Sequence, residues 1–414
     1  MMGEILFIAH RIPYPPDRGD KIRSWNIVRK LAEIAPVHIA AFADDARDMG
    51  FAPALSKVAA SHRIILRDMS RPIAGLRGVW RGEPLSVALF DHPALHAHVA
   101  HLMTERPISH VFVYSGQMAQ YVPELPQGVR FIMDFGDVDS AKFAAYGREQ
   151  AGVMGWINRR EARTLASYER QVAARADVSL FVSEAEATLF RTSADLGCDR
   201  VVALENGVDL DYYNPRADFT PLTPGERGQG PLFVFTGQMD YRPNVEAVDS
   251  FARRSLPHIR ERHPDARFAI VGRNPAPTVR ALGGLPGVVV TGAVADVRGW
   301  LAAADIVVAP LRLARGIQNK VLEAMAMARP VILSPQAAEG IDAADDRHFL
   351  IAHSSTDEVK AILALLADSD RASSLAAAAR VRVEQRYSWR ATLENLPDIM
   401  KIEVEYIDTI AKVL

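Results

Sequence analysis

The segment "LARGIQNKVLEAMAMARPVIL", residues 313–333, combines a helical pattern with a short apolar strand. Gly316 is expected to open the helix, and Lys320 and Glu323 follow it on the same helix face. The amides of Gly316 and Ile317 would then favour an anion, and Lys320 adds a cation one turn later. Glu323, two turns in, can accept hydrogen bonds from the vicinal diol of a ribose. The segment therefore indicates a nucleotide site, with a plain surface ion pair of Lys320 and Glu323 as the alternative.

Apolar runs of similar length alternate with helical patterns on both sides of this segment. The runs in the first half are Ile5–His10, Val37–Ala43, His62–Arg67, His110–Ser115, Arg130–Phe135 and Asp177–Ser183. Those in the second half are Leu232–Gly237, Arg267–Gly272, Val288–Gly292, Asp305–Pro310, Pro330–Ser334 and His348–Ala352. Continuous apolar strands separated by helices predict parallel sheets covered on both faces. We therefore expect an α/β protein with two doubly wound domains.

The domain boundaries follow from a stretch rich in Pro, Gly and Asp between the two halves. We place the first domain at 1–209, the linker at 210–230 and the second domain at 231–387. The remaining residues, 388–414, form a helical segment that is expected to pack back across the first domain. The length of 414 residues suits two domains of this size.

Composition excludes several classes of protein. The net charge of −2 gives no global field that would recruit nucleic acid. The single cysteine, Cys198, excludes a disulfide framework and a cysteine-rich metal site. Four histidines between His92 and His101 lack a further ligand pattern, so no metal is expected. The N-terminus is interpreted as a first strand, and no apolar run approaches the roughly 20 residues of a membrane span. We expect a cytoplasmic protein.

Polar residues that follow the strands are the candidate binding groups, because ligands of open parallel sheets bind beyond the carboxyl ends of the strands. In the first domain these are Gly19 and Asp20, which open the first helix, and Asp134 at a strand end. In the second domain they are Gly237, Gln238, Arg242 and Arg273. Two explanations are open for both aspartates. They either cap helices and shape loops, or they contact a substrate.

Four segments of the second half occur in the order of a known family: "LFVFTGQMDYRPNVEAV", "FAIVGRNP", "VVVTGAVADVRGWLAAADIVVAPL" and "GIQNKVLEAMAMARPVI". With "SEAEATLF" and "ENGVD" before the linker, the chain resembles the family 4 retaining glycosyltransferases, which have the GT-B fold of two Rossmann-like domains facing a cleft. More narrowly, "YPPDRGDKIRSW", "MDFGDVDSAKF" and "ARGIQNKVLEAMAM" resemble the sugar transferases associated with PEP-CTERM/exosortase exopolysaccharide loci.

The resemblance implies a glycosyltransferase that moves a sugar from a nucleoside diphosphate sugar to a lipid-linked acceptor in exopolysaccharide biosynthesis, with retention of configuration and without a cofactor. Asp20 and Asp134 are then the candidate catalytic residues. The implied donor-binding residues are Gly19, Gly237, Gln238, Arg242, Arg273, Arg315, Gly316, Ile317, Lys320 and Glu323. Glu323 matches the family's ribose-binding glutamate. Arg315 stands where the family has a sugar-binding glutamate, and Gln238 stands where it often has an arginine, so contacts with the sugar and the diphosphate must differ here.

Two basic segments have alternative interpretations. Residues 63–81 combine five arginines with Trp80 and other apolar residues, which suits contact with a membrane surface, although a solvated loop and helix is the alternative. Residues 156–170, "WINRREARTLASYER", are interpreted as the charged outer face of a helix.

Two other functions remain open at this stage. A GT-B nucleotide-sugar 2-epimerase would require a carboxylate and histidine set that the sequence does not identify. A non-catalytic protein that binds nucleotide sugars is consistent with the missing first glutamate. A NAD-dependent dehydrogenase is disfavoured because no G-x-G-x-x-G motif follows a strand.

Overall fold

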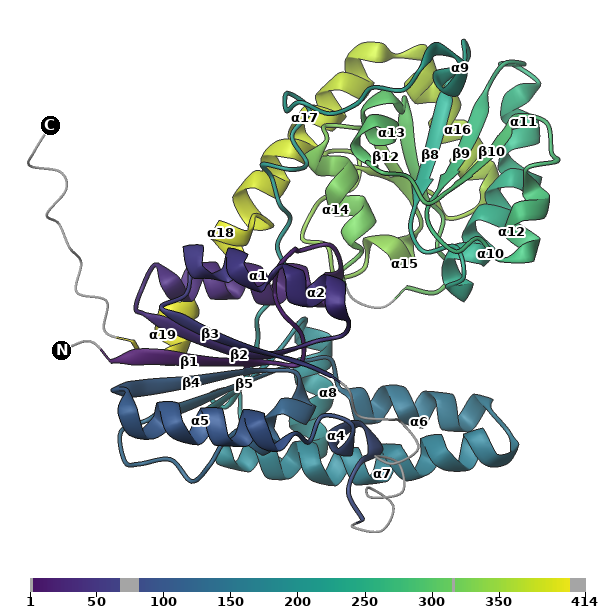
Figure 1. The fold of residues 1–414 in the computed structure, drawn as a ribbon. Helices are drawn as coiled ribbons and strands as arrows, with labels where there is room; N and C mark the ends of the chain where they lie inside the picture. Colours follow the sequence, from purple (N-terminus) through teal and green to yellow (C-terminus); the bar gives the residue numbers. More distant parts are fainter. Residues whose placement is uncertain (1–2, 68–81, 315–316, 403–414) are drawn as a thin grey trace, which may run out of the picture. The chain divides into compact units, whose positions relative to one another are not determined.

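The computed structural model describes residues 3–67, 82–314 and 317–402. The chain divides into two compact units, which Figure 1 shows as ribbons. The first unit runs to Asn206 and resumes at Leu393, and the second unit spans Gly207–Thr392. Each unit is built around one parallel sheet, as the sequence predicted.

In the described part of the first unit, seven strands form a sheet in the order β3-β2-β1-β4-β5-β6-β7. The strands are β1 (Glu4–Ala9), β2 (Val37–Ala43), β3 (Ser61–Leu66), β4 (Ile108–Tyr114), β5 (Arg130–Gly136), β6 (Val178–Phe181) and β7 (Val201–Ala203). The helices are α1 (Gly19–Ala32), α2 (Ala46–Gly50), α4 (Leu85–Ala88), α5 (Pro93–Glu105), α6 (Asp139–Glu149), α7 (Gly152–Arg175), α8 (Glu184–Ala194) and α19 (Leu396–Met400), with 3-10 turns η1 (Ala52–Lys57) and η2 (Gly116–Tyr121). Helix α1 lies on one face of the sheet and α5 on the other.

The second unit has a six-stranded sheet in the order β10-β9-β8-β11-β12-β13 among its described residues. The strands are β8 (Leu232–Thr236), β9 (Arg267–Val271), β10 (Val288–Gly292), β11 (Ile306–Ala309), β12 (Val331–Leu333) and β13 (Leu350–Ile351). The helices are α9 (Pro224–Arg227), α10 (Arg242–Ser250), α11 (Leu256–Arg260), α12 (Pro277–Leu282), α13 (Arg298–Ala303), α14 (Asn319–Ala326), α15 (Pro335–Ala338), α16 (Ser355–Ala367), α17 (Ser369–Arg386) and α18 (Trp389–Thr392), with a π-helical turn η3 (Phe251–Ser255) between α10 and α11.

Both sheets are buried because their strands are apolar on both faces. Strand β2 is buried over its whole length, and so are β8 and β11. In each sheet the first two connections run outward in one direction from the first strand, and the later strands lie on its other side. The switch point is therefore between β1 and β4 in the first sheet and between β8 and β11 in the second. Open parallel sheets bind ligands beyond the carboxyl ends of their strands near such a switch point. The fold therefore directs attention to the loops after β1 and β8.

The stretch that was expected to be a linker, 210–230, packs within the second unit. The guanidinium carbon of Arg298 lies 4.1 Å from the ring centre of Tyr212 and 5.7 Å from that of Phe219. Arg227 donates a 2.8 Å hydrogen bond to Asp305. These contacts explain why a stretch with the composition of a linker belongs to a folded domain.

The end of the chain is shared between the two units. Helix α18 still belongs to the second unit, whereas α19 belongs to the first, where the backbone of Met400 acts to raise the pKa of His110 on β4 against the lowering effect of burial. Within the described residues, no helix is both long and apolar enough to cross a membrane.

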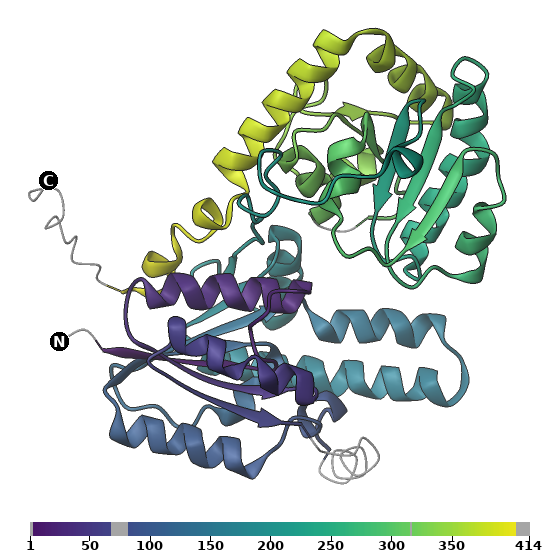
Figure 2. The same cartoon turned by 45° about the horizontal axis from the view of Figure 1, so that its top comes forward.

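One pair of helices stands out from the first unit. Helices α6 and α7 form an antiparallel hairpin that projects beyond the edge of the sheet in both views (Figures 1 and 2). At its base, Glu169 of α7 accepts hydrogen bonds from the amide and the hydroxyl of Ser140 of α6. The hairpin is thus tied to itself and leaves its far end without a sheet to cover.

Candidate functional site

Helix α14 carries the two charged residues of the nucleotide motif at the carboxyl edge of the second sheet. It begins at Asn319, three residues later than predicted, because Gln318 is extended with φ −88° and ψ 98°. Ile317 therefore precedes the helix, and its side chain is partly buried against the core. The predicted start of the helix is therefore wrong, and Ile317 does not lie on its first turn. Arg315 and Gly316 themselves lie outside the described residues.

Lys320 is the central cation of the site. Its ammonium group donates a 2.5 Å hydrogen bond to the side-chain oxygen of Asn244 and lies 4.3 Å from the ring centre of Phe235. Burial lowers the pKa of Lys320 to about 8, although the nearby Glu323 carboxylate acts in the opposite direction. An ammonium group has three donors. One is used by Asn244, so Lys320 retains N–H groups for an anionic ligand.

Two glycines make the close approach of these groups possible. Gly237, directly after β8, has φ +155°, and a Cβ atom there would lie 3.2 Å from the Lys320 nitrogen and 2.8 Å from the Asn244 amide nitrogen. Gly272, after β9, has φ +159°, and a Cβ atom there would lie 1.7 Å from the carbonyl oxygen of Gly237. Side chains rarely adopt these conformations. The glycines therefore bring two strand-end loops together and let the side chains of Lys320 and Asn244 approach the backbone at Gly237.

Glu323 lies one turn further along α14, and its carboxylate hydrogen-bonds to the Tyr213 hydroxyl. Burial raises the pKa of Glu323, while Tyr213 and the positive charge of Lys320 act in the opposite direction. Burial and the Glu323 charge together raise the pKa of Tyr213, so its hydroxyl remains a donor. The alternative of a surface ion pair does not describe this arrangement, because both charged groups are largely enclosed.

The other predicted residues of this domain are arranged around this group in different ways. Gln238 is exposed, and its backbone oxygen accepts a 2.8 Å hydrogen bond from the Asn244 amide. Arg242 opens α10 with a side chain that is 77% exposed and donates to Glu246, four residues later. Arg273 is exposed in the loop after β9. Of the predicted cations among the described residues, Lys320 is the one that lies beside Gly237.

Sequence reasoning missed Asn244 and Tyr213. Asn244 is part of the quoted "DYRPNVEAV" segment, but its contact with Lys320 joins residues 76 positions apart. Tyr213 lies in the stretch that was interpreted as a linker. The one sequence signal for Asn244 was its place directly after the Arg-Pro pair that opens a helix. The sequence carried no signal for Tyr213.

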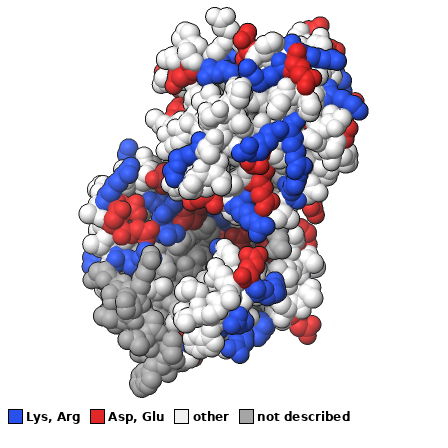
Figure 3. Space-filling model, turned by 90° about the vertical axis from the view of Figure 1, so that its right-hand side faces the viewer, with Lys and Arg blue, Asp and Glu red and all other residues white. Residues whose placement is uncertain are grey.

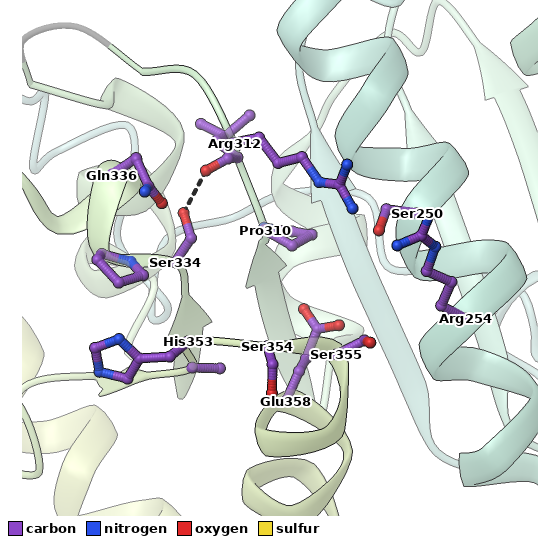
Figure 4. A pocket seen from close by; sticks show the side chains of 13 residues that line it. Ser250, Arg254, Pro310, Arg312, Ser334, Gln336, His353, Ser354, Ser355 and Glu358 are labelled. Atoms are coloured by element: carbon purple, nitrogen blue, oxygen red, sulfur yellow. Dashed lines mark hydrogen bonds between the residues drawn. The ribbon is translucent and has the colours of Figure 1, made fainter.

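A polar pocket of about 380 Å³ opens beyond the carboxyl ends of β11, β12 and β13 (Figure 4). Arg312 extends from the loop after β11 toward Ser250, and Arg254 lies on the same wall. Glu358 forms the floor, where it accepts a hydrogen bond from Ser255, and burial raises its pKa to about 7. The lining residues come from separate segments, so no sequence motif announced this pocket.

Asp20 belongs to a charged cluster at the carboxyl edge of the first sheet. Its carboxylate accepts a 2.6 Å hydrogen bond from Arg11 and lies 3.2 Å from the His10 imidazole nitrogen. Asp44, at the end of β2, binds the same Arg11 at 2.6 Å and also Arg67 at 3.0 Å. Burial alone would raise the pKa of Asp20, but the hydrogen bonds and charges of His10 and Arg11 hold it well below its usual range. This cluster therefore favours the ionised form of Asp20.

Gly19 opens α1 beside this cluster. It has ordinary backbone geometry and no atom within 4 Å of the place where a Cβ would be. The open space is compatible with ligand approach, but the position does not require glycine.

Asp134 is fully buried, and its carboxylate is occupied by Arg23, which is 1% exposed. Two nitrogens of Arg23 donate to the two Asp134 oxygens at 2.8 and 3.1 Å, and the Gly136 amide adds a third bond at 3.1 Å. Arg23 also donates to Leu204 and Asn206 near the end of the unit. This geometry favours a structural role for Asp134 over the predicted catalytic one, because an enclosed and paired carboxylate cannot meet a substrate.

Metal binding finds no support in the described residues. Across 3–67, 82–314 and 317–402, no three His, Cys, Asp or Glu side chains are grouped so that they could hold an ion.

The comparisons with known proteins agree with this geometry. Residues 230–368 match the family described as Glycosyl transferases group 1. The second unit contains a glycosyltransferase domain. The match includes the whole Lys320 and Glu323 region, and it identifies the chain as a transferase. A search of curated protein sequences finds no match.

Solved structures of similar fold extend over nearly the whole glycosyltransferase. Anabaena HepE in complex with UDP and glucose is 15% identical, with a TM-score of 0.63, over 97% of this chain and 100% of that chain. Sucrose-phosphate synthase from Thermosynechococcus elongatus is 17% identical, with a TM-score of 0.63, over 96% and 98%. WaaG, a glycosyltransferase involved in lipopolysaccharide biosynthesis, is 16% identical, with a TM-score of 0.59, over 95% and 99%. The fold of both units is therefore GT-B, as the resemblance implied.

Proposed function

We propose that this chain transfers a sugar from a nucleoside diphosphate sugar to a lipid-linked acceptor in exopolysaccharide assembly, at the cytoplasmic face of a membrane and with retention of anomeric configuration. The observation that supports donor binding most directly is Lys320, whose ammonium group is held by Asn244 at the carboxyl edge of β8, where Gly237 lets it approach the backbone. The UDP and glucose in the HepE structure make a uridine donor the first one to test.

The division of labour on the donor follows from the charges. Lys320 binds the diphosphate and stabilises the charge that develops on it as the sugar leaves. Glu323, oriented by Tyr213, accepts hydrogen bonds from the ribose diol. Gly237 allows the diphosphate to approach the backbone. The reaction then depends on positioning and on stabilisation of the leaving group, and it needs neither a resident metal nor a side-chain triad.

Asp20 and the arginines around it belong to the first unit. We propose that they position the acceptor or the donor sugar. An ionised carboxylate in a cluster of guanidinium groups is well suited to hold sugar hydroxyls or a phosphate-linked acceptor in a fixed orientation. Arg11 and Arg67 supply the positive charge there.

The test is a screen of UDP- and GDP-linked sugars for thermal stabilisation of the full chain, followed by product analysis with a polyprenyl-phosphate-linked acceptor. We expect one donor to stabilise the protein and to release free nucleoside diphosphate together with a glycosylated lipid of unchanged anomeric configuration. Conversion of the donor without an acceptor would identify an epimerase. Stabilisation without any turnover would identify a binding protein.

A further inference from the structure

The far end of the α6–α7 hairpin exposes a group of apolar side chains. Val153, Met154 and Trp156, in the first turns of α7, are 74%, 57% and 53% exposed, and Tyr146 near the end of α6 is 41% exposed. Exposed apolar residues on soluble proteins are normally scattered, and a contiguous group marks an interaction site. We call these four residues the hairpin patch.

Val153 and Trp156 of the hairpin patch lie away from the face with which α7 packs on its own unit, whereas Met154 stands four residues before Asn158 on the line of that face. The buried side of α7 is a stripe that includes Asn158, Ala162, Leu165 and Val172. Trp156 lies on the opposite side, and its line along the helix continues through Arg160, which is largely covered and donates to the Glu83 backbone, to the exposed Arg163, Ser167 and Arg170. The outer face of α7 thus has an apolar end and a basic continuation.

The surroundings of the patch are strongly basic. Residues 142–170 contain six basic and three acidic side chains, and two of the acidic ones, Glu161 and Glu169, are buried and accept hydrogen bonds from Ser86 and Ser140. The basic residues are Lys142, Arg148, Arg159, Arg160, Arg163 and Arg170. Figure 3 views the side to which the hairpin projects, and uncharged surface in its lower part lies beside Lys and Arg and also beside Asp and Glu. Because the whole chain has a net charge of −2, this positive charge is local.

We propose that the hairpin patch docks on the surface of a bilayer that contains anionic phospholipids. Trp156, Val153 and Met154 would enter the boundary between headgroups and acyl chains, and the arginines would meet the headgroup phosphates. A helix with Trp and aliphatic residues beside Arg is typical of segments that lie in this interface. The sequence placed membrane contact at residues 63–81, of which 68–81 lie outside the described residues, and interpreted 156–170 as an ordinary charged face.

A cavity connects the hairpin patch with the charged cluster of the same unit. It has a volume of about 600 Å³ and is lined by Leu89, Phe143, Met154 and Ile157, with Arg67 at one side. Met154 belongs to both the patch and the cavity, and Arg67 binds Asp44 of the Asp20 cluster. Membrane docking then has a purpose that rests on the proposed function, because docking at the patch would bring a lipid-borne acceptor to this cavity and to Arg67.

A second copy of the chain fits the patch less well than a membrane. Two such ends face to face would bring like charges together, since the basic side chains surround the apolar group. Four partly exposed side chains also cannot supply the roughly 800 Å² that each partner buries in a stable interface. An anionic bilayer is complementary both to the apolar group and to the charge around it.

The experiment is co-sedimentation of the full chain with vesicles, without donor or acceptor. We expect binding to phosphatidylcholine vesicles that contain phosphatidylglycerol, weaker binding at high salt, and little binding to phosphatidylcholine alone. Tryptophan emission should shift to the blue in the wild type, and the shift should be lost in Trp156→Phe. Binding to neither kind of vesicle by a folded protein would overturn the proposal.

Matched variants separate the patch from general surface effects. Met154→Gln with Trp156→Gln should lower the vesicle partition coefficient about tenfold or more, because it removes two large apolar groups from the contact. Arg163→Ser should lower it only with anionic vesicles. The control is Leu189→Gln with Arg262→Ser, which changes an apolar residue that is 46% exposed on α8 and an exposed arginine of the other unit. Equal binding by the patch variant and the control would contradict the assignment.

Two further measurements keep the outcomes distinct. The proposal would be overturned in favour of a dimer contact if the wild type self-associates without vesicles, does not bind vesicles, and loses its self-association in Trp156→Gln. Nucleotide affinity should be the same in the patch variant and the wild type. A wild type that binds vesicles but no nucleotide sugar would refute the proposed function and leave membrane docking intact. A wild type that binds a nucleotide sugar but no vesicles would refute membrane docking and leave the proposed function intact.

Discussion

The ammonium group of Lys320 donates a 2.5 Å hydrogen bond to the side-chain oxygen of Asn244, and this bond joins the start of α14 to the start of α10. The two helices follow β11 and β8, neighbouring strands on the two sides of the switch point. A cation at this place is held by a neutral amide and an aromatic ring, and the carboxylate of Glu323 acts on it as a counter-charge. The arrangement keeps the positive charge available, which is what an anionic ligand requires.

Replacement of Lys320 by Met should weaken UDP binding by about ten- to a hundredfold, because a charge-assisted hydrogen bond contributes roughly 1.5–3 kcal/mol. Met keeps the aliphatic stem over Phe235. Isothermal titration of the nucleoside diphosphate measures the effect. Lys360→Met, an exposed lysine on α16, is the matched control and should be neutral. A Lys320→Met variant that binds as tightly as the wild type would remove Lys320 from the site.

The same residue predicts a pH dependence. The pKa of Lys320 is lowered to about 8 by burial, so the group is charged at pH 7 and loses its charge as the pH rises through 8. UDP affinity should therefore fall by about thirtyfold between pH 7 and 9.5, in line with the loss of one proton above the pKa. In Lys320→Met this decline should be absent. A wild-type affinity that is flat over this range would contradict the assignment.

Glu323→Gln should lower nucleotide affinity about tenfold or more by removing a charged acceptor, while the fold remains intact. The decisive comparison uses UDP and 2′,3′-dideoxyuridine diphosphate. The wild type should prefer the ribose form, and the variant should lose most of that preference, because the missing diol and the missing carboxylate are two halves of one contact. Glu261→Gln, on the exposed end of α11, is the control. Equal preference in the variant and the wild type would show that Glu323 does not contact the ribose.

The sequence was sufficient for the parallel strands and their order in two domains, because continuous apolar runs leave little choice between alternatives. It missed β7, since a run of three residues, Val201–Ala203, is too short to stand out. It placed the start of α14 too early because nothing in the local pattern shows that Gln318 is extended. Asp134 looked like a candidate catalytic residue because its partner, Arg23, lies 111 residues away. Contacts over such distances come from the tertiary fold, which no local pattern contains.

Asp134→Ala should destabilise the protein by about 3–5 kcal/mol, because it leaves the Arg23 charge buried without its partner. Urea unfolding monitored by circular dichroism measures this loss. The double variant Arg23→Met with Asp134→Leu should be less destabilised than Asp134→Ala, since it leaves no unpaired charge. Asp137→Ala, an exposed aspartate three residues further on, is the control. A catalytic role would instead predict normal stability and lost turnover in Asp134→Ala.

Two buried glutamates, one in each unit, should make the protein less stable as the pH rises. Burial raises the pKa of Glu169 and of Glu358 from 4.5 to about 7, and each accepts a hydrogen bond from a serine. The folded state therefore binds more protons than the unfolded state between these values, so each group's stabilisation is present below pH 4.5 and is lost as the pH rises through 7. The loss is up to about 3 kcal/mol for each residue. Glu169→Gln and Glu358→Gln should each flatten the decline in unfolding free energy between pH 5 and 8, and each variant should be more stable than the wild type at pH 8. Variants that follow the wild-type curve over this range would show that neither carboxyl group is protonated in the folded protein.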